Sequence, residues 1–189
     1  YSSAASDVYK RQNMMFFNFL NEPYIAIIGD IKNSKKIVDR GAFQEHLKKI
    51  LDNINLKYSD CIASKFTITL GDEFQGLLTT GNNIMEIIQY IKKEIYPVKI
   101  RFGIGIGSIS TKINSEISIG ADGPGYYKAR ESIETLKKSE RKKEKSQVDI
   151  QVKIDGDNKL QELSLNTIFK LLYSIETCLL YTSPSPRDR

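Results

Sequence analysis

Residues 69–78 read TLGDEFQGLL, and this stretch contains the clearest turn signal in the chain. The residues before the turn, KFTITL at 65–70, alternate and are rich in β-branched side chains, which is typical of a strand. After the turn, residues 74–79 return as an apolar partner, so the stretch predicts a β-hairpin. Its tip carries two adjacent carboxylates, Asp72 and Glu73, where one polar residue and a glycine would suffice.

Hydrophobic periodicity places the other elements around this hairpin. Short apolar runs and alternating stretches predict strands, and apolar residues at helical spacing predict amphipathic helices. The order β-α-β-β-α-β-α-β-α, with two strands joined directly, is the split β-α-β, ferredoxin-like pattern. It predicts an α+β fold in which an antiparallel sheet has helices packed on one face, with an extra C-terminal strand and helix. The predicted strands are 24–30, 65–70, 74–79, 98–109 and 147–154, and the predicted helices are 40–56, 84–95, 126–138 and 165–176.

The composition is that of a soluble globular domain. The chain has 189 residues, of which 40% are hydrophobic and 27% are charged, enough for one domain with its own core. No apolar run approaches the roughly 18–20 residues of a membrane span, so we expect no membrane partner. The single histidine, His46, lies far from the acids in the sequence, which argues against a Ser-His-Asp or Cys-His nucleophile.

The glycines of GIGIGS at 103–108 alternate with isoleucines along a predicted strand. No GKS or GKT follows them, which argues against a phosphate-binding P-loop. Their glycine face instead predicts the close approach of a helix or a nucleotide.

The two ends of the chain do not share the pattern of their neighbours. Residues 1–12 and 178–189 resemble translated adaptor sequence, and we expect both to be artefacts, the second replacing the native C-terminus. A single domain is therefore expected at 22–177. Removing the ends removes four basic and two acidic residues, which lowers the formal net charge from +5 to +3 and weakens any case for nucleic-acid binding. Cys61 is then the lone cysteine, as suits a reducing cytoplasm.

Two aspartates end neighbouring elements. Asp30 ends the first predicted strand, and Asp72 lies in the hairpin. In a ferredoxin-like sheet the first strand lies beside the strand that carries this hairpin, so we expect both carboxylates at one end of the sheet. Facing carboxylates repel unless a cation lies between them, and such oxygen ligands suit Mg²⁺ or Mn²⁺ together with substrate phosphates. The alternative is a cap or turn aspartate at each position, and Glu73 suits a further ligand and a solvent-facing turn residue equally well.

Basic residues near these acids allow two interpretations. Lys32 and Lys35 follow the first strand and suit either triphosphate oxygens or solvent. The run KKSERKKEK at 137–145 has acids interleaved with its lysines, which favours a solvated helix end over a nucleic-acid surface.

Four ordered blocks resemble a known family. They are IIGDIKNSKKI, TLGDEFQGLL, RFGIGIG and GADGPGYYKARE, and together they resemble the SatD family of bacterial proteins over about 24–177. The same blocks are similar to the palm domains of GGDEF diguanylate cyclases and class III nucleotidyl cyclases, which implies a palm fold with a metal site. Some SatD members carry a helix-turn-helix after the palm-like part, which here would lie beyond Thr177.

The resemblance assigns roles to residues of the first strand, the hairpin and the third predicted helix. It implies that Asp30 and Asp72 are catalytic metal ligands, with Glu73 and the Ile31 carbonyl as further ligands. Arg130 matches the basic residue that contacts phosphate in both cyclase families.

The chain departs from the cyclase pattern at three places. Leu70 replaces the first glycine of GGDEF, Tyr126 replaces the asparagine four residues before the arginine, and residues 63–66 lack the inhibitory RxxD element. The resemblance therefore carries over the palm fold and the metal site but not the synthesis of c-di-GMP or cAMP.

Two functions follow from the resemblance. The first is binding of a nucleoside triphosphate with Mg²⁺ (or Mn²⁺), and nucleotidyl transfer or cyclisation if the protein is an enzyme. The second is a non-catalytic nucleotide-sensing or dimerisation domain of a cytoplasmic transcriptional regulator, which contacts DNA only through a tail absent from this chain. The base, the product and a homodimer are left open. In the first function Lys32, Lys35 and Arg130 meet the phosphates, and Tyr126 or Tyr127 lines the base.

Overall fold

The computed structural model describes residues 22–142 and 148–182 and confirms the predicted order of strands and helices. The largest boundary difference is in the last helix, which runs over 159–182 where 165–176 was predicted. The predicted artefact at 1–12 lies outside the described residues, as does 183–189 of the second one. The strands are β1 (Tyr24–Ile31), β2 (Ile62–Leu70), β3 (Glu73–Leu78), β4 (Ile100–Gly107) and β5 (Ile150–Ile154). The helices are α2 (Arg40–Lys57), α3 (Ile84–Glu94), α4 (Pro124–Arg141) and α5 (Lys159–Thr182), with short 3-10 helices η1 (Ser34–Lys36) and η2 (Ser59–Cys61).

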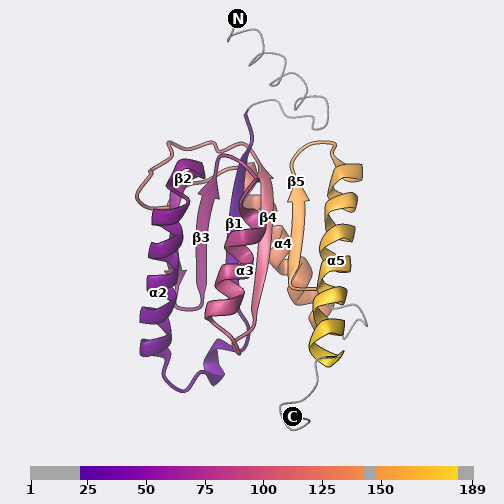
Figure 1. Cartoon of the computed structure of the whole chain (residues 1–189). Coiled ribbons are helices and arrows are strands. Elements are labelled where there is room, and N and C mark those ends of the chain that lie inside the picture. The colour runs from indigo at the N-terminus through magenta and orange to yellow at the C-terminus, as the bar shows by residue number, and fades with distance from the viewer. Residues whose placement is uncertain (1–21, 143–147, 183–189) are drawn as a thin grey trace, which may run out of the picture.

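The five strands form one mixed sheet in the order β2-β3-β1-β4-β5 (Figure 1). β1 is antiparallel to both β3 and β4, whereas β5 is parallel to β4. The first strand therefore lies beside the hairpin strand, as predicted, and Asp30 is directly opposite Glu73 on one side and Arg101 on the other. The predicted α+β class, with an extra strand and helix at the C-terminal end, is confirmed.

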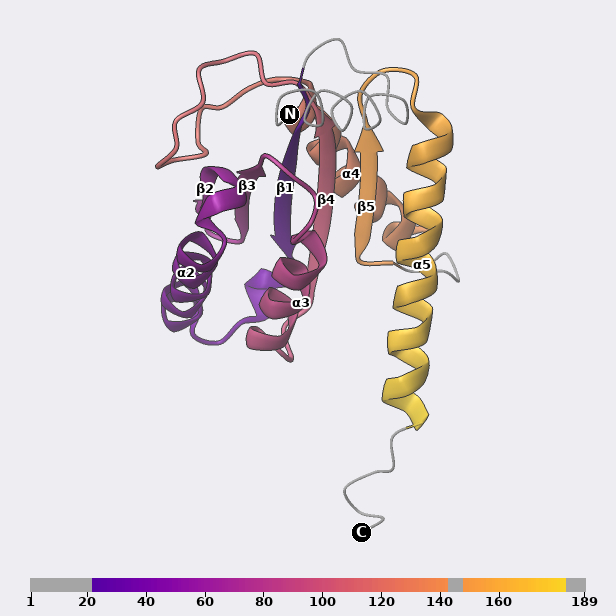
Figure 2. The same ribbon diagram turned by 45° about the horizontal axis from the view of Figure 1, so that its top comes forward.

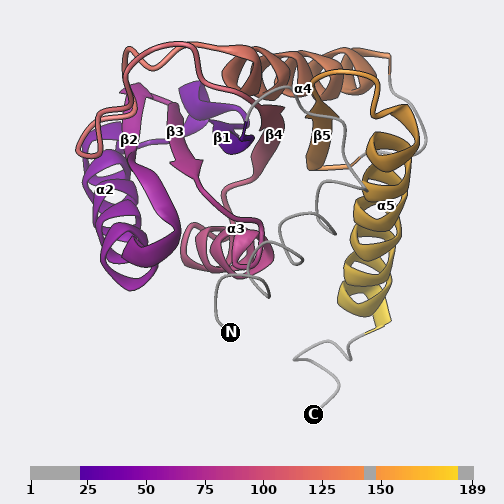
Figure 3. The ribbon, with the colours of Figure 1, turned by 90° about the horizontal axis from the view of Figure 1, so that it is seen from above.

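Helices cover both faces of the sheet, so the prediction of one covered face is wrong (Figure 3). α2 and α3 pack on one face and α4 packs on the other. The reason lies in β1, whose residues are apolar on both sides. Ile27 and Ile31 belong to the core under α2 and α3, and Ala26 and Ile28 belong to the cluster under α4. A strand that is apolar on both sides needs cover on both.

The backbone of α4 lies directly on β4 because this strand has glycine at alternate positions. Gly103 and Gly105 both face the helix. A Cβ atom added at Gly105 would lie 2.0 Å from the Gly125 carbonyl oxygen and 2.2 Å from the Ala129 nitrogen, which are both backbone atoms. The glycine face thus sets the distance between α4 and the sheet, and the close approach that the sequence predicts is made by a helix.

α5 lies beside β5, and its C-terminal part extends past the sheet (Figure 2). Leu165 and Phe169 pack against the main core. Farther along the helix, Glu176 forms an ion pair of 2.7 Å with Lys92 of α3. None of the helices in the described residues is long and apolar enough to cross a membrane.

Replacing Gly105 with alanine is expected to destabilise the fold by about 3 kcal/mol or more, at the upper end of the usual cost of overpacking, because the clashing atoms are backbone. Thermal unfolding would show a fall in Tm of about 6–12 °C. Gly81→Ala is the control, since a Cβ there would lie 3.5 Å from its nearest neighbour. Equal Tm values for the two variants would contradict this account of the helix–sheet contact.

Candidate functional site

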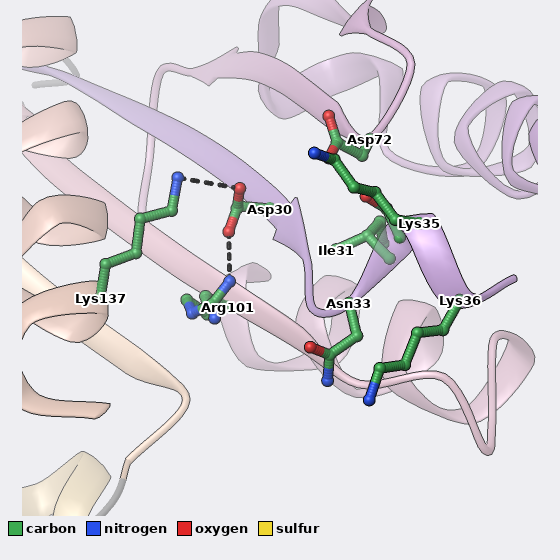
Figure 4. Close-up of a pocket in the computed structure, with 9 residues that line it drawn as sticks. Asp30, Ile31, Asn33, Lys35, Lys36, Asp72, Arg101 and Lys137 are labelled. Atoms are coloured by element: carbon green, nitrogen blue, oxygen red, sulfur yellow. Dashed lines mark hydrogen bonds and ion pairs between the residues drawn. The ribbon is translucent and has the colours of Figure 1, made fainter. Parts of the chain in front are cut away.

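A pocket of about 420 Å³ opens at the end of β1 (Figure 4). Its walls come from β1, the η1 loop, the turn between β2 and β3, the start of β4 and the C-terminal half of α4. The lining residues are Asp30, Ile31, Asn33, Ser34, Lys35, Lys36, Asp72, Arg101 and Lys137.

Hydrogen bonds tie the hairpin tip to the loop after β1. Asn33 has the left-handed backbone conformation (φ 54°, ψ 35°), which asparagine adopts more easily than most residues, and the chain enters η1 there. The Ser34 hydroxyl then donates to Asp72 Oδ2 at 2.7 Å. The Ile31 amide donates to the main-chain oxygen of Asp72 at 2.9 Å. These two bonds hold Asp72 beside Ser34 and Ile31.

Asp30 has a cationic partner on each of its carboxylate oxygens. Arg101 Nη1 lies 2.5 Å from Oδ2, and Lys137 Nζ lies 3.1 Å from Oδ1. Only 10% of the Asp30 side chain is exposed. Arg101 reaches it from the neighbouring strand and Lys137 from α4, whereas Asp72 lies across the pocket beside η1 (Figure 4). The two aspartates thus line one pocket, as predicted, but Asp30 is already neutralised.

Arg101 is held on its other side by Glu140 of α4. Its Nε and Nη2 atoms lie 3.1 and 2.5 Å from Glu140 Oε2, and Lys32 forms an ion pair with Oε1 of the same carboxylate. Burial lowers the pKa of Arg101, but its bonds to Glu140 and Asp30 outweigh this effect, and the pKa lies above its ordinary value. The guanidinium is therefore fixed between two carboxylates.

Glu140→Gln is expected to weaken this network in a pH-dependent way. Burial raises the pKa of Glu140, but the hydrogen bonds and charges of Arg101 and Lys32 outweigh it and hold the pKa below its ordinary value of 4.5. A carboxylate with a lowered folded-state pKa adds stability above its unfolded-state pKa and loses it as the pH falls through the folded-state pKa. At pH 7 we expect a loss of roughly 1.5–3 kcal/mol, the usual range for a hydrogen bond to a charged group.

Urea unfolding of wild type and Glu140→Gln at several pH values measures this difference, which should shrink as the pH falls below 4.5. Glu134→Gln, an exposed position on the same helix, is the matched control. A difference of constant size down to acidic pH would show that Glu140 does not act through its charge.

Five of the other predicted residues lie outside the pocket lining, and three of them, Glu73, Arg130 and Lys32, form ion pairs. Glu73 is the first residue of β3, and its Oε1 atom lies 3.4 Å from Arg130 Nη2. Lys32 pairs with Glu140 as described, although its neighbour Lys35 does line the pocket. Arg130 and Lys32 are thus both paired with carboxylates outside the lining. Of the three predicted phosphate-binding residues, Lys35 is the one that lies in the pocket wall.

Tyr126 and Tyr127 lie at the N-terminal end of α4, away from the pocket. Tyr126 precedes Lys137 by eleven residues, which corresponds to about 16 Å along a helix axis. It is buried in the apolar cluster between α4 and β1, and burial raises its pKa. In the part of the chain that the structure describes, its hydroxyl has no hydrogen-bond partner. Tyr127 is exposed and donates to Asp122 at 2.6 Å.

Arg101 and Lys137 are pocket residues that the sequence analysis did not predict. Arg101 interrupts an otherwise apolar strand, and a charged residue in such a strand is a signal for a buried partner. Lys137 begins the charged run that was interpreted as a solvated helix end. Its spacing of seven residues from Arg130 places both on one face of α4, which is the signal that would have found it.

A divalent cation is the cofactor that the resemblance implies, and the donor set can be compared with its needs. Asp72, Asp30 and Ile31 line one pocket and offer the oxygen ligands that Mg²⁺ prefers. Within the described ranges, no group of three or more His, Cys, Asp or Glu side chains is placed to bind a metal. The donors therefore fit a cation that completes its shell with ligand phosphates and water, and at Asp30 that cation would replace a side-chain partner.

Comparisons with known proteins identify a family and several solved structures of low sequence identity, two of which follow. The sequence model of the SatD family matches residues 24–177 of this chain. No curated protein is similar enough to count as a match. One similar structure is the catalytic core of a rhodopsin-guanylyl cyclase with converted specificity in complex with ATPαS, at 17% identity and a TM-score of 0.45, covering 60% of this chain and 72% of that one. Another is an EAL/GGDEF domain protein from M. capsulatus, at 15% identity and a TM-score of 0.42, covering 71% and 88%.

Proposed function

Since this chain belongs to the SatD family, we propose that its α+β domain binds a nucleoside triphosphate with Mg²⁺ (or Mn²⁺) in the pocket beside Asp30 and Asp72. The observation that supports this best is the combination of charges in one small pocket. Four basic side chains and two carboxylates line it. Basic groups favour a phosphate chain, and carboxylates beside them favour the cation that accompanies it.

The proposed phosphate-binding residues differ in the partners that they have before a ligand binds. Lys35 and Lys36 are exposed on η1 at the pocket wall and need only turn toward a ligand. Lys32 and Arg130 would exchange their present carboxylate partners for phosphate oxygens. The pocket volume of about 420 Å³ lies within the usual range of small-ligand sites, about 300–1,000 Å³.

The protein residues would supply positioning in this site. Asp72 is oriented by Ser34, and Asp30 by Arg101, so both carboxylates are held before any ligand binds. The bound cation would neutralise phosphate charge and act as a Lewis acid. If the protein turns its ligand over, the reaction of this class is nucleotidyl transfer with pyrophosphate release.

Nucleotide binding is expected to stabilise the folded chain. At a ligand concentration ten times Kd, the gain is about 1.4 kcal/mol, which raises the Tm of a chain of this size by about 3–6 °C. Thermal unfolding with ATP or GTP, each with and without Mg²⁺, measures the shift. Asp72→Ala is expected to lose the Mg²⁺-dependent part, whereas Asp52→Ala, exposed on α2, is expected to keep it. If neither nucleotide with Mg²⁺ stabilises the wild type, the proposal fails.

A non-catalytic nucleotide sensor is the second candidate, and one observation favours it. Both oxygens of Asp30 are paired with cationic side chains, which leaves this carboxylate less available for metal-dependent chemistry. Leu70 and Tyr126 also replace residues of the cyclase pattern. Pyrophosphate release over several hours, measured at saturating nucleotide, separates the candidates, because an enzyme produces it and a sensor does not.

Assembly and location stay predictions. Sedimentation of the purified protein would test the homodimer. DNA contact through a tail belongs to the sensor candidate, whereas a cytoplasmic location is predicted for both candidates, and each needs the protein in its cell.

A further inference from the structure

The two cationic partners of Asp30 are held with unequal firmness. Arg101 is bound on both sides, by Asp30 and by Glu140, and only 14% of its side chain is exposed. Lys137 is 29% exposed and reaches Asp30 through a flexible four-carbon stem. Of the two, Lys137 is therefore the partner that can leave Asp30 at lower cost.

The position of Lys137 conflicts with that of a divalent cation. Its ammonium group lies 3.1 Å from Asp30 Oδ1 and occupies a position that a metal bound to this oxygen could otherwise take. The wall already carries Arg101, Lys35 and Lys36, so a cation added without an anion would meet strong repulsion. A phosphate chain removes both obstacles, because it attracts the lysine and offsets the positive charge.

Building on the proposed function, we propose that Lys137 is a displaceable counter-ion of Asp30. It holds Asp30 Oδ1 before ligands bind, moves to a phosphate when the nucleotide enters, and thereby frees Oδ1 for the divalent cation. Arg101 stays on Oδ2 and keeps the carboxylate oriented. The cation and the nucleotide then bind cooperatively, and by linkage each strengthens the binding of the other to the same extent.

The Lys137→Met variant tests this role, because the proposal predicts that its affinity for one ligand rises while its affinity for the other falls. Mn²⁺ binding without nucleotide, measured by electron paramagnetic resonance of the free ion, is expected to become about five- to tenfold tighter, at the lower end of typical coupling between sites. Binding of a non-hydrolysable ATP analogue in the presence of Mn²⁺ is expected to become weaker by a similar factor. A merely structural role would weaken both.

Lys138→Met is the matched control, since it removes the same charge from the next, exposed position of α4. It is expected to change either affinity less than about twofold, as is usual for a screened surface charge. Lys137→Gln is a second variant with the same expected pattern, and the Tm of each variant shows whether it is folded.

The outcomes separate this inference from the proposed function. Mn²⁺ binding by Lys137→Met that is no tighter than that of Lys138→Met, or unchanged nucleotide binding, overturns the displaceable counter-ion. If the wild type still binds nucleotide with Mn²⁺ in that case, the proposed function stands alone. If neither the wild type nor Lys137→Met binds Mn²⁺ or the nucleotide, both proposals fail.

Discussion

The contact between α4 and the glycine face of β4 determines the rest of this structure. Because Gly103 and Gly105 carry no side chain, the helix backbone lies directly on the strand, closer than a Cβ atom at either position would allow. The rotation and height of α4 then decide which of its side chains reach the end of the sheet. Lys137 and Glu140 meet Asp30 and Arg101 there as a consequence of how α4 packs on Gly103 and Gly105.

The pocket combines this helix with a row of charges across three strands. Glu73, Asp30 and Arg101 are directly opposite one another on β3, β1 and β4. Charges in such a row must be neutralised because they are largely removed from water. α4 provides the neutralising groups, Arg130 above Glu73 and Lys137 above Asp30. An anionic ligand with its cation can replace these internal pairs without leaving a carboxylate unpaired, which is why the same arrangement suits both a resting state and a bound state.

Local patterns and the family resemblance predicted the elements and four of the nine residues that line the pocket. The alternation of 65–70 and the acidic turn gave the hairpin, and the split β-α-β order placed Asp30 and Asp72 at one end of the sheet. Arg101 and Lys137 were not predicted because their roles depend on strand register and on the docking of α4, which no local period records. The docking of α4 also explains the position of Tyr126. The resemblance assigned this residue to the nucleotide base, but it lies at the end of α4 opposite to the pocket.

The central claim is that the carboxylates and lysines of this one pocket bind a triphosphate and its cation together. A crystal structure with Mn²⁺ and a non-hydrolysable ATP analogue tests it most directly, since the anomalous signal locates the metal. We predict an Mn²⁺ peak in contact with Asp72 and Asp30 Oδ1, with the Lys137 ammonium on a phosphate oxygen. A nucleotide bound elsewhere on the chain, with Lys137 still on Asp30, would contradict the account.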